Sequence, residues 1–256
     1  MLDITKPSDN ITYLQNRVNA RKQKLSISSI KLILSAFLWK LNNESHDLDE
    51  ITRQKLIIDY KKSLASFKII TDNLEKDHAN IHGHIPKWND ILSVRDEQLK
   101  LGNLKYHLIL SLFTYIPPRR LTDYIVLKFV ISDTYTTDKK FNYYVQQSKH
   151  FVFNVFKTSK AFKTQIINST DELSSIIDNY VETNNIENEH LLLDMHDYHQ
   201  LYTILNKLLH CSIDNIRHSF ISFSYQSGLV DSSTLESNAN NMAHSLSTHL
   251  RYRKNI

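Results

Sequence analysis

The chain has 256 residues, which is enough for one large domain or two small ones with a sizeable core in either case. Hydrophobic residues make up 41% and charged residues 23% of the sequence, as in ordinary globular proteins, and three glycines and four prolines favour helices over turn-rich sheet. The sequence excludes a membrane-spanning helix, because it has no run of about 18 apolar residues, and its first residues do not form a signal peptide. The single cysteine, Cys211, excludes an internal disulfide and a zinc-finger cluster.

The net charge of +4 is small, but the charged residues are unevenly distributed. Residues 101–165 contain ten Lys or Arg and three Asp or Glu, whereas residues 166–215 contain one Lys and nine Asp or Glu. A basic region next to an acidic one predicts a polarised surface. A basic face is typical of proteins that bind DNA.

The amino-terminal part is predicted to be helical after residues 1–12, which are polar and expected to lack regular structure. Residues 13–24 predict a short basic helix, residues 27–42 an amphipathic helix that begins at Ser28 or Ser29, and residues 49–76 a longer helix. The apolar side of the second helix is expected to consist of Leu32, Leu34, Phe37, Leu38 and Leu41.

A stretch that contains glycine and proline, residues 80–86, is the clearest linker signal in the sequence. It predicts two domains, residues 1–86 and residues 87–256. The two histidines of this stretch, His82 and His84, have no cysteine partners, so they fit a loop better than a metal site. We expect no metal in the protein.

The second domain is predicted to be mainly α-helical with a small antiparallel β-sheet. Residues 141–167 predict strands with a turn near residues 158–160, because aromatic and β-branched side chains alternate there. Pro117-Pro118 is expected to end one helix and open another, which places Arg119 and Arg120 near a helix N-terminus. Helical patterns occur at residues 88–100, 103–116, 171–183, 197–209 and 216–226.

Three short motifs and one tyrosine indicate phosphate chemistry. The motifs are Arg119-Arg120-Leu121-Thr122-Asp123, Asp214-Asn215-Ile216-Arg217-His218-Ser219-Phe220 and Met242-Ala243-His244-Ser245, and they precede Tyr252, which is flanked by Arg251, Arg253 and Lys254. A tyrosine that attacks a phosphate needs its phenol oxygen as the nucleophile and fixed cations around the phosphate. A protein supplies both without a metal.

These motifs resemble those of the tyrosine recombinases, the phage-type integrases. Arg120, Thr122 and Asp123 resemble the Arg, Ser and Glu of the family's first arginine box, Gly-Leu-Arg-x-Ser-Glu-Leu. Residues 214–220 resemble the second box, His-x-x-Arg-His-Ser/Thr-Phe, and residues 242–245 resemble the Leu-Gly-His-Ser stretch before the nucleophile. The resemblance covers roughly residues 90–256.

The resemblance implies roles for the tyrosine and the arginines. Tyr252 would attack the scissile phosphate and form a 3′-phosphotyrosyl link, helped by neighbouring cations that favour the phenolate. Arg120 and Arg217 would bind the two non-bridging oxygens with their planar guanidinium groups. Asp123 would orient Arg120 from the same helix face, and Arg119 is the rival for the position of Arg120.

The resemblance also implies roles for a lysine and a histidine. Lys157, in the predicted turn between strands, would protonate the leaving 5′-oxygen as the general acid, with Lys160 as its competitor. His244 would donate a hydrogen bond to the phosphate or stabilise the phenolate. Tyr252 lies eight positions after His244, whereas the family usually has nine.

Asp214 departs from the family pattern, which has His or sometimes Lys at this position. An ionised carboxylate cannot donate a hydrogen bond to a phosphate. It is placed to pair with Arg217 or His218, three and four positions later on the same helix. The departure implies slower chemistry, a different proton acceptor or a divergent lineage.

The resemblance implies a site-specific recombinase or integrase that acts on double-stranded DNA as a homotetramer, without a cofactor and away from membranes. Its amino-terminal domain would be a helical DNA-clamping domain. We expect the protein in the nucleus or cytoplasm of a host cell and not secreted, and its Asn-, Ile- and Lys-rich composition is associated with the AT-rich genomes of mobile elements and viruses. The alternatives are a monomeric type IB topoisomerase and a catalytically inactive DNA-binding relative.

Overall fold

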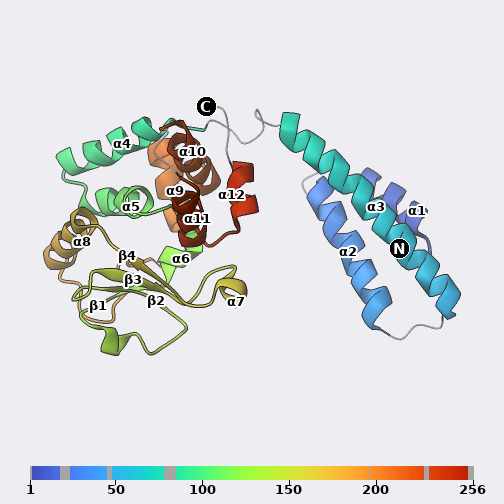
Figure 1. Ribbon diagram of the computed structural model, residues 1–256, viewed down its shortest axis with the longest axis horizontal. Coiled ribbons are helices and arrows are strands. Elements are labelled where there is room, and N and C mark those ends of the chain that lie inside the picture. The colour runs from blue at the N-terminus through green and yellow to red at the C-terminus, as the bar shows by residue number, and fades with distance from the viewer. Residues whose placement is uncertain are drawn as a thin grey trace. The chain divides into compact units, whose positions relative to one another are not determined.

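The computed structural model describes residues 2–17, 24–44, 48–77, 85–195, 197–227 and 231–252. The chain folds as two compact units, Met1–Ile81 and His82–Ile256 (Figure 1). His82 and His84 of the predicted linker lie outside the described residues. Within the described ranges, every helix is too short or too polar to span a bilayer.

The first unit contains three helices in its described part, α1 (Pro7–Asn16), α2 (Ile27–Asn43) and α3 (Glu50–Asp77). Helix α2 packs along α3, and the buried apolar side chains of the unit form a core of their own. This core consists of Leu14, Ile30, Leu34, Leu41, Leu56, Ile57, Tyr60 and Phe67. The Tyr60 hydroxyl ties the start of the chain to it, since it donates to the Ile4 carbonyl at 3.1 Å and accepts from the Asn10 amide at 3.0 Å.

The start of this unit is more ordered than the sequence suggests. The expectation that residues 1–12 lack regular structure is wrong, since α1 begins at Pro7. Proline suits the first turn of a helix, where its missing N–H has no intrahelical partner in any case. Of the basic helix predicted at residues 13–24, residues 13–16 belong to α1, and residues 18–23 lie outside the described part.

Helix α2 is found where it was predicted but differs in two details. Its cap is Ser26, whose hydroxyl accepts from the backbone N–H of Ser29 at 3.1 Å, rather than Ser28 or Ser29 itself. Leu32 is 73% exposed, because helical periodicity places it opposite the buried Leu34. The predicted helix at residues 49–76 is α3, displaced by one residue at each end.

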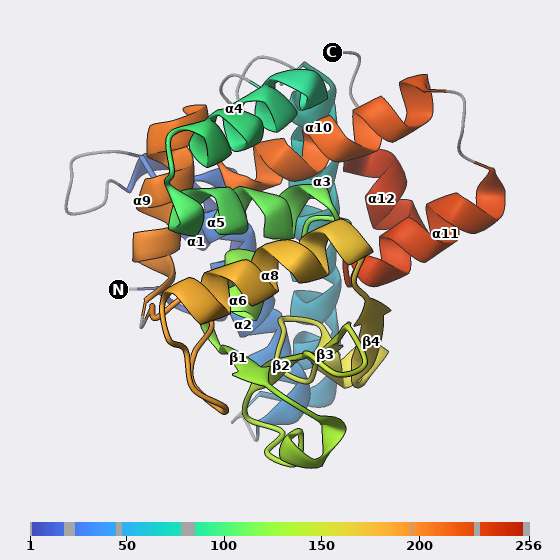
Figure 2. The same cartoon turned by 90° about the vertical axis from the view of Figure 1, so that its left-hand side faces the viewer.

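The second unit combines helices with one four-stranded sheet. Its helices are α4 (Trp88–Lys100), α5 (Leu104–Thr114), α6 (Leu121–Ile125), η2 (Asp133–Tyr135), α7 (Ser159–Phe162), α8 (Asp171–Thr183), α9 (Tyr198–Leu209), α10 (Ile213–Gln226), α11 (Ser232–Asn241) and α12 (Leu246–Tyr252). Helices α4 and α8 have the predicted bounds. Helix α10 begins three residues earlier than predicted, because Ser212 caps it, and the sequence did not predict α11 or α12. In Figure 2 the sheet lies at the lower end of this unit, below α8.

The sheet is mixed, so the prediction of an antiparallel sheet is only partly right. Its strands are β1 (Leu127–Val130), β2 (Asn142–Val145), β3 (His150–Phe153) and β4 (Gln165–Asn168), in that order. Strands β2 to β4 form antiparallel pairs, whereas β1 runs parallel to β2. The first pair is parallel because the chain leaves the end of β1, crosses back through η2 and enters β2 beside the start of β1.

The two faces of the sheet bury different clusters, as strand alternation requires. The face toward the helices joins the main core through Leu127, Phe129, Tyr144, Phe151, Phe153 and Ile167. The other face holds a small cluster of Val130, Tyr143, Val145 and Val152. The turn predicted at residues 158–160 is the short helix α7, which follows β3 and leads into β4. Because β3 and β4 are paired, the connection between them holds α7 at this edge of the sheet.

Candidate active site

Helix α10 buries a polar face. It begins at Ser212, whose hydroxyl accepts from the Asn215 N–H at 3.2 Å, and it packs against α4 and α12. Its buried polar side chains include Arg217, His218, Ser219 and Ser222. Burying a polar group is costly unless it has a hydrogen-bond partner or a ligand. The partners of Arg217 and His218 therefore indicate the function of this face.

The end of α11 brings His244 toward α10. The Ala243 N–H donates to the Asn240 carbonyl at 2.8 Å, and the His244 N–H donates to the Ala239 carbonyl at 3.1 Å. These two bonds form a Schellman motif, which needs a left-handed residue at the position of Ala243. Its φ is +54°, and the resembling family has glycine at the same place. The motif reverses the chain between α11 and α12.

The last carbonyls of α11 bind side chains from four other segments. Gln165 of β4 donates to the Asn240 carbonyl at 2.8 Å, and Arg119 donates to the Asn241 carbonyl at 2.6 Å. Arg217 donates weakly to the Met242 carbonyl at 3.4 Å, and the Thr158 hydroxyl donates to the Ala243 carbonyl at 2.8 Å. A helix C-terminus carries orphan carbonyls and a partial negative charge, which suits cationic donors. This helix end therefore assembles the site.

Arg119 is a buried structural cation whose Nε and Nη1 have protein acceptors, whereas its Nη2 has none among the described residues. Its Nε donates to Asp123 Oδ2 at 2.9 Å and its Nη1 to Gln165 Oε1 at 2.8 Å, and its guanidinium carbon lies 4.1 Å from the ring centre of Phe153. The expectation that Asp123 orients Arg120 is therefore wrong, because the carboxylate pairs with Arg119 instead. Helix α6 begins only at Leu121, so its helical spacing does not extend back to Arg120.

Arg120 lies within electrostatic reach of residues of α10 and α12. It occupies the N-cap position of α6 and is half-buried. Its Nη1 is buried and has no hydrogen-bond partner among the described residues. Burial is the largest cause that lowers the pKa of Arg217 and of His244. The positive charge of Arg120 is among the further causes that lower both pKa values. The adjacent arginines thus differ in their partners: Arg119 pairs with Asp123, whereas Arg120 makes no salt bridge within the described residues.

Arg217 is a buried cation with unused donors. The side chain is fully buried, and its Nη2 contacts His244 Nδ1 at 2.8 Å. Its Nε and Nη1 are buried without a hydrogen-bond partner in the part of the chain that the structure describes. The ring centre of Tyr252 lies 5.2 Å from its guanidinium carbon. Burial lowers the pKa of Arg217, but a guanidinium stays charged in proteins.

Two buried histidines support Arg217. Arginine only donates, so His244 Nδ1 accepts its hydrogen bond and the ring proton lies on Nε2, which contacts His249 Nδ1 at 3.0 Å. Burial, followed by the charge of Arg217, lowers the pKa of His244 to about 3 and that of His249 to about 4. Both rings are therefore neutral near pH 7. Both ring nitrogens of His244 are engaged by Arg217 and His249. In this arrangement His244 positions Arg217 and has no ring N–H left to donate to a phosphate.

His249 is the site residue that the sequence analysis missed. It is fully buried on α12, and it occupies no position in the motifs that drew attention to His244 and Tyr252. Its spacing was the available signal, since it lies three residues before Tyr252 and so shares a helix face with it.

Tyr252 is held by contacts on three sides. Its ring stacks on His218 with centroids 4.4 Å apart, and its backbone carbonyl accepts from His218 Nδ1 at 2.6 Å. Its hydroxyl donates to Asp214 Oδ1 at 3.3 Å. Burial raises the pKa of the phenol; Arg217 and Arg120 oppose the rise, and Asp214 adds to it. The cations predicted to flank the tyrosine cannot be placed around it, because the side chain of Arg251 and residues 253–256 lie outside the described residues.

The two candidate lysines lie at the margin of the site. Lys157 is exposed just before α7, and Lys160 is exposed within α7. The bond from Thr158 to the Ala243 carbonyl holds their segment beside the end of α11. Of the predicted residues, the structure thus gathers Arg120, Asp214, Arg217, His218, His244 and Tyr252. Arg119 and Asp123 form an adjoining network.

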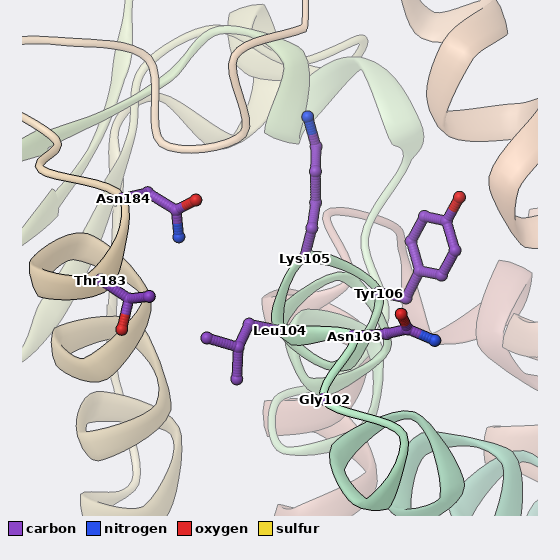
Figure 3. Close-up of a pocket in the computed structure, with 7 residues that line it drawn as sticks. All are labelled: Gly102, Asn103, Leu104, Lys105, Tyr106, Thr183 and Asn184. Atoms are coloured by element: carbon purple, nitrogen blue, oxygen red, sulfur yellow. The ribbon is translucent and has the colours of Figure 1, made fainter.

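A separate pocket lies between the start of α5 and the end of α8 (Figure 3). It measures about 350 Å³ and is lined by Gly102, Asn103, Leu104, Lys105, Tyr106, Thr183 and Asn184. None of these residues belongs to the arginine–tyrosine cluster, and we assign it no role.

Comparisons with known proteins give a distant structural likeness. No protein-family model matches the sequence, and no curated protein matches it. A crystal structure of XerA recombinase is similar with a TM-score of 0.49 and 13% sequence identity, over 98% of this chain and 94% of that one. The functional assignment below rests on the residues of the site.

Proposed function

We propose that this protein is a site-specific DNA recombinase or integrase that cleaves and rejoins strands through a covalent 3′-phosphotyrosine on Tyr252. One observation carries the proposal: the Tyr252 ring lies 5.2 Å from Arg217, a buried cation whose Nε and Nη1 have no partner among the described residues. Leaving a buried donor unpaired costs about 1–3 kcal/mol, so donors that are kept in this state call for an explanation. An anion bound beside the phenol explains them.

In this reaction the scissile phosphate binds between Arg120 and Arg217, and their unused N–H groups donate to the non-bridging oxygens. The phenol oxygen of Tyr252 attacks phosphorus, and the bond to the 5′-oxygen breaks. The pentacoordinate transition state carries more negative charge on these oxygens than the substrate does, so the two guanidinium groups stabilise it preferentially. Lys157, on its exposed segment beside Ala243, protonates the leaving 5′-oxygen.

The phosphotyrosine link keeps the energy of the phosphodiester, so rejoining needs no nucleotide cofactor. Exchange requires two duplexes to be cut, which implies a homotetramer on DNA. We assign the first unit to clamping the duplex. Its helix α3 exposes Lys55 and Lys62, which are seven residues apart on one face. Contacts of this kind give binding that weakens steeply with salt.

A pool of nicked duplexes with a randomised centre tests the chemistry. The nick lets the short cleaved fragment leave, so covalent adducts accumulate, resist SDS and can be sequenced. We expect adducts with the wild-type chain and none with Tyr252→Phe, which should still bind duplex. The control is Tyr202→Phe on α9, which removes a hydroxyl from a side chain that is 42% exposed and should leave the adduct yield unchanged. Adducts from Tyr252→Phe at the wild-type level would overturn the proposal.

The selected duplex also separates the recombinase from its rivals. Strand exchange between paired copies, with a tetramer in sedimentation, supports the recombinase. Relaxation of supercoiled plasmid by a monomer without exchange supports a type IB topoisomerase. Binding without adducts on any duplex supports an inactive DNA-binding relative.

A further inference from the structure

We propose that Asp214 is the base that takes the proton from Tyr252 during cleavage and returns it during rejoining. This inference rests on the proposed function. It assigns a proton acceptor that is particular to this chain, since the resembling family has His or Lys at the position of Asp214.

The hydroxyl of Tyr252 already points at this carboxylate. It donates to Asp214 Oδ1 at 3.3 Å, a long hydrogen bond of the kind that tightens when substrate binds. The stacked ring of His218 and its bond to the Tyr252 carbonyl fix the orientation of the phenol. Asp214 and Arg217 lie three residues apart on α10, so the acceptor and the phosphate-binding cation face the same phenol.

The other groups around the phenol are poor acceptors. Arg120 and Arg217 carry only donors. Both ring nitrogens of His244 are engaged, and burial followed by the neighbouring charges lowers its pKa to about 3. His218 lies against the face of the ring and donates through Nδ1 to the backbone. Asp214 is the group that the hydroxyl actually meets.

Proton transfer also removes the electrostatic objection to an anion beside a phosphate. The proton moves from the phenol oxygen to Asp214 as that oxygen bonds to phosphorus. The bond to the 5′-oxygen breaks, its electron pair stays on the 5′-oxygen, and that oxygen takes a proton from Lys157. The carboxylate loses its charge as the phosphorane gains one, so the repulsion of the ground state is relieved in the transition state. Rejoining runs the same transfers in reverse.

The first test compares Asp214→Asn and Asp214→His on a duplex selected with the wild-type chain. We expect Asp214→Asn to slow adduct formation about 10²–10⁴-fold, the usual contribution of a general base. Duplex affinity should stay the same or rise, because one negative charge is gone. Asp214→His should recover at least ten-fold over Asp214→Asn, since imidazole also accepts a proton. Glu236→Gln, which removes an exposed acid from α11, should behave as wild type.

The second test replaces the leaving 5′-oxygen by sulfur. A thiol has a pKa of about 8.5, so a thiolate leaves without a general acid. This substrate should restore adduct formation by Lys157→Ala to within a few fold of wild type. It should not restore Asp214→Asn, because the missing step is at the nucleophile.

The outcomes separate this inference from the function on which it rests. If the wild-type chain forms no adduct on any duplex, the proposed function fails. If the wild-type chain forms adducts and folded Asp214→Asn forms them within about three-fold of its rate, Asp214 is not the base while the function stands. Rescue of Asp214→Asn by the sulfur substrate would likewise overturn the inference. Matching thermal midpoints of wild type and Asp214→Asn confirm that the variant is folded.

Discussion

Two fully buried arginines lie at the same helix end but in opposite surroundings. Arg119 pairs with Asp123, binds Gln165 and the Asn241 carbonyl, and stacks on an aromatic ring. Arg217 makes no salt bridge within the described residues and keeps two nitrogens, Nε and Nη1, unpaired. Arg119 belongs to the fold, because a buried carboxylate neutralises it, although its Nη2 has no partner among the described residues. Arg217 lacks such a carboxylate and leaves two nitrogens unpaired, which is costly and calls for an anionic ligand.

Substitution by methionine at Arg119 should have the largest effect on folding. It leaves the Asp123 carboxylate, which is 1% exposed, buried without its partner. We expect the free energy of unfolding to fall by about 3–5 kcal/mol, as when other buried ion pairs are broken. Urea unfolding measures the change. The double variant Arg119→Met/Asp123→Leu should recover much of it; no recovery would mean that the ion pair is not the main contribution of Arg119.

The same substitution at Arg217 should separate stability from chemistry. We expect Arg217→Met to change the free energy of unfolding by less than about 1 kcal/mol, since removing an unpaired buried cation offsets the lost bond to His244. Adduct formation should fall about 10²–10³-fold, as when one preorganised donor is lost from an active site. If Arg217→Met unfolds as readily as Arg119→Met, the contrast between the two arginines is wrong.

The histidines behind Arg217 should make stability depend on pH. Burial, then Arg217, lowers the pKa of His244 to about 3 and of His249 to about 4, from 6.5. As the pH falls from about 6.5 to about 4, the unfolded chain binds protons that the folded chain excludes. Stability is therefore lost on acidification, by up to about 1.4 kcal/mol per pH unit for each histidine.

Urea unfolding of His249→Gln at pH 7.5 and pH 5 measures the contribution of one ring. We expect a shallower loss than in the wild type. An unchanged slope would show that His249 is protonated in the folded protein.

The turn that both arginines bind should tolerate glycine with the smallest effect. Ala243→Gly removes the strain of a left-handed alanine, which stabilises the folded state by about 1–2 kcal/mol. It also loses a buried methyl group, at a cost of about 0.8 kcal/mol, and it increases the conformational entropy of the unfolded chain, at a cost of about 0.5–1 kcal/mol. We expect a net change below about 0.5 kcal/mol. Ala239→Gly, inside α11, lacks the relief and should destabilise by about 1–2 kcal/mol. Equal losses at both positions would argue against strain at Ala243.

Hydrophobic periodicity predicted the helices whose apolar faces meet the core. Helices α4 and α8 have the predicted bounds, because their buried side chains recur at helical spacing. Helix α11 escaped prediction because its sequence, SSTLESNANN, has almost no apolar stripe; it is fixed by its Asp231 cap and by the side chains at its other end. The parallel pairing of β1 follows from tertiary packing, which local sequence does not encode.

The sequence identified the members of the site better than their partners. Motif resemblance pointed to Arg217, His244 and Tyr252, which the structure brings together. It assigned Asp123 to Arg120, because residue spacing does not reveal that the helix begins only after Arg120. It missed His249, whose helical spacing from Tyr252 hints at a shared face but whose role depends on the fold that places its ring against His244.

The end of α11 also governs when the cluster can form. Its four carbonyl contacts join positions separated by 75, 122, 25 and 85 residues. Closing loops of this length costs entropy that only the completed contacts repay. None of the four can form until residues 240–243 have left the ribosome. Arg119 and Arg217 are therefore brought to the same turn only after this segment has been made, and the cluster assembles later than the local helices and strands that precede it.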